Sequence, residues 1–227
     1  MENLKLTKRI IILMEIIWLG HSCFRLRSQE TVVITDPFPD SIGMALENRS
    51  AHIVTISNNN VNHSYTDDVS GNPKMFSAPG EYEYSGVSVK GAMTPLDELA
   101  KREERNIAFT ITLDGINICH LGKLTTPLTT AIVDELGPID VLLVPVGGHG
   151  LIELNGIQQI MQDFDPKIVI PMQYKTQGLQ IDLDTVDAFL TMQSSSELQP
   201  QPRISVTPSN LPPSLNISLL SPQSKPS

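Results

Sequence analysis

Cysteine is scarce in this chain of 227 residues, which contains only Cys23 and Cys119. Both cysteines lie in apolar runs that are typical of β-strands. Two isolated thiols do not make the disulfide framework of a secreted scaffold, and free cysteines are usual in a reducing compartment. The cysteine content therefore predicts a cytoplasmic protein.

Basic residues are outnumbered by acidic ones. The chain has 16 Lys and Arg against 25 Asp and Glu, which gives a formal net charge of −9. A protein that binds nucleic acid generally needs a surplus of positive charge to neutralise phosphates. The charge balance thus argues against a nucleic-acid partner, although it names no other partner.

Long apolar runs are absent as well. Lys8 and Arg9 precede apolar residues in a pattern similar to a signal peptide, but Glu15 interrupts that run and leaves it too short to span a bilayer. We therefore expect no membrane segment. Because Met14 starts what reads as a complete first strand, we interpret residues 1–13 as an N-terminal extension. Residues 14–221 are predicted to form one domain and residues 222–227 a flexible tail.

The first half of the chain is patterned as β-structure. Residues 15–19, 23–26 and 31–35 predict an antiparallel meander, and residues 52–56, 74–77, 81–84 and 87–91 predict further strands. Asp114 and Gly115 join two apolar runs, 108–113 and 116–120, as a favoured two-residue hairpin turn.

The second half alternates strands with helices. Helical patterns cover residues 129–136, 156–164 and 183–193, and buried strands are expected at 140–145 and 167–171. Residues 203–207 and 215–220 are interpreted as a closing pair of strands. This alternation predicts a layered α/β domain.

The segment from residue 54 to residue 63 is the most informative part of the sequence. An apolar strand runs into Ser57, three asparagines in a row, Val61, Asn62 and His63. The spacing is that of a binuclear metal-binding loop, Ser-His-x-His-x-Asp-His, in which three of the four ligand positions carry Asn.

Further segments complete a family pattern in the same order along the chain. They are residues 18–24 (WLGHSCF), 34–38 (ITDPF), 79–83 (PGEYE), 118–122 (ICHLG), 144–148 (VPVGG) and 168–175 (IVIPMQYK). Together they resemble the metallo-β-lactamase-fold metal-dependent hydrolases, in particular the branch related to the ascorbate-6-phosphate lactonase, over roughly residues 14–220. The resemblance implies a four-layer αββα sandwich that holds one or two zinc or manganese ions and uses them to activate water.

The resemblance also locates the positions of the metal ligands, and most of them have changed. Asn58 and Asn60 stand at histidine positions, Asn62 and Lys123 at aspartate positions, and Gln173 at the last histidine position. His63 is retained, and the loop after the 87–91 strand, where the family has a further histidine, reads Thr94-Pro95-Leu96-Asp97. A neutral amide is a poor zinc ligand, and an ammonium group repels a cation. We therefore expect a degenerate member of the family without a metal cofactor.

Two residues near these positions have expected structural roles. The resemblance implies that Asp36 braces the loop by accepting backbone hydrogen bonds. We hypothesise that Lys123 replaces the charge of the lost metal, paired with Asp36 or hydrogen-bonded to the asparagine side chains.

The remaining candidates are less specific. His149 lies in a Gly-rich loop and would be either a new ligand or general base, or an exposed loop residue. His21 and His120 are expected to be buried, and Glu81 is either a base at a cavity mouth or part of a half-exposed strand. The sequence contains no Gly-x-Ser-x-Gly nucleophile elbow.

Three functions remain open. The first is a metal-free binding or regulatory protein whose cavity, lined by Asn, Gln and Lys, accepts a polar or anionic small molecule. The second is a hydrolase remodelled around His63, His149 and Asp36, with Glu81 as a further base. The third is a structural subunit that pairs with an intact relative, which leaves the oligomeric state open. The loss of ligands favours a non-enzyme over metal-dependent hydrolysis, and we take the binding or regulatory protein as the leading interpretation.

Overall fold

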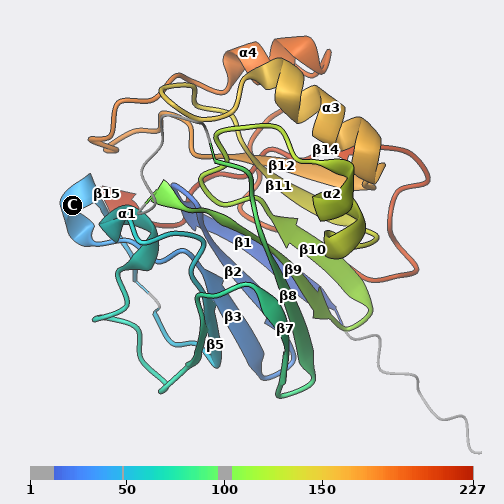
Figure 1. Ribbon diagram of the computed structural model, residues 1–227. Coiled ribbons are helices and arrows are strands. Elements are labelled where there is room, and N and C mark those ends of the chain that lie inside the picture. Colours follow the sequence, from blue (N-terminus) through green and yellow to red (C-terminus); the bar gives the residue numbers. More distant parts are fainter. Residues whose placement is uncertain (1–12, 48, 97–103, 227) are drawn as a thin grey trace, which may run out of the picture.

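Two β-sheets packed face to face form the centre of the molecule (Figure 1). The computed structural model describes residues 13–47, 49–96 and 104–226. The first sheet has the order β13-β1-β2-β3-β5-β6 and consists of β1 (Met14–Gly20), β2 (Cys23–Ser28), β3 (Thr31–Thr35), β5 (Ile53–Thr55), β6 (Lys74–Phe76) and β13 (Ile204–Val206).

The second sheet has the order β14-β12-β11-β10-β9-β8-β7. Its strands are β7 (Gly80–Tyr84), β8 (Val87–Met93), β9 (Ile107–Leu113), β10 (Ile116–His120), β11 (Val141–Pro145), β12 (Ile168–Met172) and β14 (Asn216–Ile217). The hairpin expected around Asp114 is β9 and β10, and the expected meander is β1, β2 and β3, all antiparallel.

The main core lies between the sheets. Strand residues two apart point to the same face, so Ile16 and Trp18 of β1 face inward together, as do Phe109 and Ile111 of β9. All four side chains are fully buried.

Helices α2 (Thr130–Leu136), α3 (Leu154–Phe164) and α4 (Asp187–Met192) cover the outer face of the second sheet (Figure 1). In α3, Ile157, Ile160, Met161 and Phe164 are buried at the three- and four-residue spacing of one helix face. Strands β11 and β12 are therefore buried on both faces, which explains their unbroken apolar sequences. These layers confirm the α/β sandwich.

The outer face of the first sheet is covered by shorter elements. A second core contains Ile34, Phe38, Ile42 and Leu179, among others, beneath the 3₁₀-helix η1 (Asp40–Ile42) and β4 (Met44–Ala45). Strand β15 (Lys225–Pro226) pairs with β4, and the amide of Gln223 donates to the carbonyl of Trp18 at 2.9 Å. The segment expected to be a flexible tail is thus attached to the domain as far as Pro226.

Two expectations about the second half were wrong. Strands β13 and β14 do not pair with each other, because β13 joins β1 and β14 joins β12 in the other sheet. The last helix begins at Asp187, not at residue 183. The reason is that the backbone of Asp184 donates to the carbonyl of Gly147 and accepts from the amide of Lys175, at 2.8 Å in each case.

Residues 1–12, which make up nearly all of the expected N-terminal extension, lie outside the described residues. Within the described ranges, no helix is both long enough and apolar enough to cross a membrane.

Candidate functional site

The ends of several strands converge at one end of the sandwich. Strands β1, β3 and β5 run in the same direction, so His21, Asp36 and Ser57 follow them at the same edge of the first sheet. Backbone hydrogen bonds join this edge to the second sheet: the amide of Gln173 donates to the carbonyl of His21, and the amide of Ile107 donates to that of Ser57. The candidate residues of both sheets therefore meet at this edge.

Asp36 is the centre of the buried cluster. Its carboxylate accepts the amide of Ser57 at 2.7 Å and the Ser57 hydroxyl at 2.5 Å, and it contacts Nδ1 of His63 at 2.8 Å. The Ser22 hydroxyl lies 3.0 Å from the same ring nitrogen. Burial raises the pKa of Asp36, whereas His120 and the hydrogen bonds from Ser57 and Ser22 lower it. The loop-bracing role expected for Asp36 is therefore confirmed.

The contact with Asp36 fixes the tautomer of His63. Nδ1–H donates to the carboxylate, which leaves Nε2 with a free lone pair, and no described residue forms a hydrogen bond with Nε2. Burial lowers the pKa of His63 to about 3, and the positive charge of Lys123 acts in the same direction. His63 is thus a neutral imidazole at physiological pH.

The other two buried histidines differ in their contacts. In His120, Nε2–H donates to the carbonyl of Ser22 at 2.8 Å and Nδ1 accepts the amide of Gly122 at 3.2 Å, so both ring nitrogens are used. In His21, Nδ1 is buried without a partner among the described residues. The His21 ring packs against the His63 ring in an edge-to-face arrangement, with 4.8 Å between the ring centroids. Burial lowers the pKa of both residues.

The asparagines stabilise their own loop. The Asn58 side chain accepts the amide of Asn60 at 3.0 Å and donates to the Ser57 hydroxyl at 3.1 Å. Asn60 caps α1 (Val61–Ser64) by accepting the amide of Asn62 at 2.9 Å. Both side-chain oxygens therefore stabilise the turn and are not directed toward a shared centre.

Lys123 and Gln173 lie beside this loop. Gln173 donates through Nε2 to the carbonyl of Gly122 at 2.8 Å, and the amide of Lys123 donates to Oδ1 of Asn106 at 2.8 Å. Within the described ranges, no carboxylate lies within ion-pair distance of Lys123, so the hypothesis that it pairs with Asp36 was wrong. The partners of Asp36 are Ser57 and His63.

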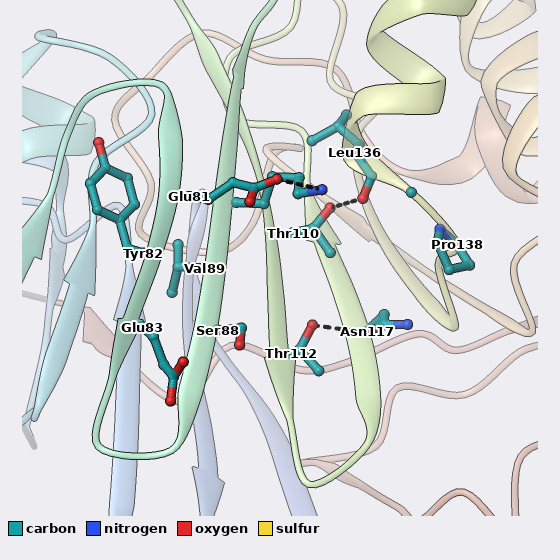
Figure 2. Close-up of a pocket in the computed structure, with 12 residues that line it drawn as sticks. Glu81, Tyr82, Glu83, Ser88, Val89, Thr110, Thr112, Asn117, Leu136 and Pro138 are labelled. Atoms are coloured by element: carbon teal, nitrogen blue, oxygen red, sulfur yellow. Dashed lines mark hydrogen bonds and ion pairs between the residues drawn. The ribbon is translucent and has the colours of Figure 1, made fainter.

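His149 and Glu81 belong to other parts of the surface. The ring nitrogens of His149 lie 3.3 Å from carboxylates of Asp182 and Asp184, and the side chain is 42% exposed. Glu81 overlooks a groove of about 430 Å³ on the outer side of the second sheet, where it forms an ion pair with Lys90 at 2.9 Å (Figure 2). Neither residue contacts Asp36 or His63.

No sequence pattern indicated a role for Ser22, Ser57 or Asn106. Asn106 is buried and connects the carbonyl of Leu121 with the amide of Lys123, at 2.9 and 2.8 Å. No local pattern marks it, because its partners are distant in sequence. Ser57 is the first residue of the loop pattern, but the pattern gave no reason to expect its hydrogen bonds to Asp36.

The donor set does not fit a zinc or manganese site. Such sites need three or four converging imidazole, thiolate or carboxylate ligands. The part of the chain that the structure describes contains no group of three or more His, Cys, Asp or Glu side chains placed to hold a metal ion. The lone pairs of His63 and His21 supply two imidazoles at most, and the carboxylate of Asp36 already accepts three hydrogen bonds from protein groups.

Comparison with known proteins identifies the class. A family model described as "Beta-lactamase superfamily domain" matches residues 15–173. The chain belongs to this superfamily and has the metallo-β-lactamase fold, in agreement with its two sheets and flanking helices.

Individual relatives place the chain among metal-dependent hydrolase-like proteins. It is 27% identical over 187 residues to the UPF0173 protein PF0020 of Pyrococcus furiosus, covering 72% of this chain and 84% of the relative. It is 26% identical over 205 residues to the UPF0173 metal-dependent hydrolase Ta0764 of Thermoplasma acidophilum, covering 78% and 85%.

Solved structures agree. A putative Zn-dependent hydrolase of the metallo-β-lactamase superfamily from Thermotoga maritima is 33% identical, with a TM-score of 0.75 and coverage of 91% of this chain and 98% of that one. The metallo hydrolase Igni18 from Ignicoccus hospitalis shares the fold at 18% identity, with a TM-score of 0.59 and coverage of 86% and 97%.

The buried histidines predict a loss of stability in acid. The folded chain keeps His21, His63 and His120 neutral, whereas the unfolded chain protonates them below pH about 6.5. Keeping the three histidines neutral does not reduce the free energy of unfolding above pH 6.5. As the pH falls from 6.5 toward 3, the free energy of unfolding decreases by up to about 1.4 kcal/mol per pH unit for each histidine. The pKa of Asp36 is raised, so protonation of this carboxyl stabilises the folded chain as the pH falls. This effect offsets the loss from at most one of the three histidines.

We therefore expect urea unfolding to give a free energy about 2–4 kcal/mol lower at pH 5 than at pH 7.5. Replacing His52, whose side chain is exposed, should leave this difference unchanged. Equal stability at the two pH values would show that the buried imidazoles can be protonated in the folded state.

Gly122 allows a close approach between the two sheets. It has a φ of +62°, and an added Cβ would lie 2.2 Å from Oδ1 of Asn106 and 2.5 Å from Cβ of Ser57. Gly86 has a similar φ of +76° but nothing within 4 Å of an added Cβ. We expect Gly122→Ala to lower the free energy of unfolding by about 1–3 kcal/mol more than Gly86→Ala, which carries the backbone strain alone. Equal losses in urea titrations would contradict the close packing.

Proposed function

We propose that this chain is a metal-free member of its family that binds a small polar or anionic molecule beside the 57–63 loop and acts as a binding or regulatory protein. The observation that carries this proposal is that Asn58 and Asn60 use their side-chain oxygens within their own loop. To coordinate an ion, they would have to break the turn that they form. The two residues are therefore structural in the proposed function.

The charge of the site favours an anion over a cation. The carboxylate of Asp36 is enclosed by Ser57 and His63, whereas Lys123 is only half-buried and lacks a carboxylate partner within the described ranges. Its ammonium group lowers the pKa values of both His63 and His21, so its positive charge acts on the site. A ligand with a negative group would satisfy this charge.

The proposal also includes the branch of the family and the cellular compartment. The resemblance of the 54–63 and 168–175 segments suggests descent from the lactonase-like branch of the family, and the free cysteines suggest the cytoplasm. In this proposal the ancestral catalyst kept its fold while its ligand positions were replaced.

Calorimetric titrations with zinc and with phosphate test the proposal. We expect the wild-type protein to bind no stoichiometric zinc and to bind phosphate, and we expect Lys123→Gln to weaken phosphate binding by about tenfold, as for the loss of one hydrogen bond to a charged group. Lys74→Gln is the control, because it removes the same charge at an exposed position on β6.

Zinc or manganese that is retained at nearly one ion per chain after washing with a chelator would contradict the proposal. Phosphate binding that Lys123→Gln leaves unchanged would assign the anion to another part of the surface.

One specific observation favours a second candidate, a hydrolase with a remodelled site. Asp36 holds His63 in the tautomer whose Nε2 lone pair is free, which is the arrangement of a general base with an orienting carboxylate. His149 and Glu81 do not contribute, since both contact other groups.

Assays with ester, lactone and phosphodiester substrates in the presence of a chelator test this candidate. If His63 is a base, His63→Gln lowers kcat by about 10²–10⁴. Because the pKa of His63 is about 3, the activity would stay constant between pH 8 and pH 5. The absence of turnover in the wild-type protein, or turnover that His63→Gln leaves unchanged, would reject it.

A further inference from the structure

A groove of about 330 Å³ lies on the outer side of the first sheet, away from the Asp36–His63 cluster. Its walls come from β1, β2 and the segments around Leu46, Arg203 and Gln223. Ile17, Leu19 and Leu46 give it an apolar part, and none of its residues belongs to the candidate site described above. A ligand in this groove would therefore be independent of the former metal loop.

Three arginines line this groove. Arg25 and Arg27 are two residues apart on β2 and so point to the same face of the sheet. In the β1–β2 ladder, Arg25 lies opposite Ile17, and Arg27 lies opposite Glu15. From the other side, Arg203 reaches Glu15, with Nε 3.2 Å from Oε1. The three arginines thus line the groove together with Ile17 and Glu15 of β1.

Two of these guanidinium groups, those of Arg25 and Arg27, form no ion pair within the described ranges. Arg25 donates to the carbonyl of Ser50 at 3.1 Å, and Arg27 has a long contact of 3.5 Å to the carbonyl of Gln29. Neither forms an ion pair with any carboxylate within the described ranges, and Glu47 on the groove wall pairs with Lys225 at 2.5 Å. By contrast, Arg49 contacts both Asp40 and Asp68.

The two cations also destabilise each other. Burial lowers the pKa of Arg25, and the neighbouring charge of Arg27 lowers it further, while Glu15 partly offsets both effects. Glu15 is shared with Arg203, and no carboxylate of the described residues forms an ion pair with Arg25 or Arg27. An anion placed between the two guanidinium groups would relieve the repulsion.

We propose that this groove is a binding site for a small organic anion, whose carboxylate or phosphate lies between Arg25 and Arg27 and whose apolar body covers Ile17, Leu19 and Leu46. The planar guanidinium group matches both oxyanions with paired hydrogen bonds. Pockets for small molecules combine an apolar lining with a few placed polar groups, and this groove has both features.

Four probes separate the contributions of charge and apolar surface. Phenyl phosphate and benzoate carry both features, inorganic phosphate carries the charge alone, and benzyl alcohol carries the ring alone. In calorimetric titrations we expect the first two to bind at least about tenfold more tightly than the last two. The tighter binder of phenyl phosphate and benzoate shows whether the groove prefers a phosphate or a carboxylate.

Variants assign the binding to this groove. We expect the double variant Arg25→Gln and Arg27→Gln to bind phenyl phosphate and benzoate about tenfold or more weakly than the wild-type protein, because hydrogen bonds to charged groups are lost. Lys74→Gln, which removes a positive charge from an exposed position on β6 outside the groove, is the control and should change nothing. Glu15→Gln should strengthen binding severalfold, because it removes a competing carboxylate and frees Arg203.

Equal affinity in the double arginine variant and the wild-type protein would overturn the proposal, as would equal weakening by Lys74→Gln. If the double variant does not fold, unchanged or weaker binding in Glu15→Gln is sufficient to reject the site. Binding of an acidic peptide without either aromatic anion would also reject it, in favour of a protein partner.

Discussion

A single buried carboxylate holds the candidate site together. Asp36 follows β3, and its hydrogen bonds reach Ser57 after β5 and His63 in α1, so it joins three segments that are separate in sequence. Because Asp36 is fully buried, its partners are needed to compensate for the loss of hydration. The shape of the 57–63 loop therefore rests on hydrogen bonds between protein groups.

The same arrangement decides the electrostatic character of the site. A structural carboxylate keeps one proton on His63, while burial and Lys123 oppose a second one. Burial likewise lowers the pKa of His120, and its two ring nitrogens serve one backbone acceptor and one backbone donor. The cluster of imidazoles is thus a set of neutral hydrogen-bonding groups next to one ammonium group. This electrostatic character underlies the proposal that the site recognises an anion.

Local sequence patterns predicted most of the strands and the layered architecture, because alternation and unbroken apolar runs directly reflect burial on one or two faces of a sheet. The resemblance to the metallo-β-lactamase family located the 57–63 loop and Asp36. The sequence patterns could not show that Asn58 and Asn60 bond within the loop, or that Asn106 supports Lys123, since these contacts depend on side-chain direction and on distant partners. Glu81 and His149 were placed correctly on a strand and a loop, but the faces they occupy follow from the packing of the layers.

The pairing of β13 with β1 has a consequence for synthesis on the ribosome. Strand β1 emerges early and finds β2 next to it, but its other edge stays open until residues 204–206 have been translated. During most of translation, the nascent chain therefore displays an unpaired, apolar strand edge, which is a template for intermolecular aggregation. The yield of folded protein in a cell should accordingly depend on how this edge is shielded before the chain is finished.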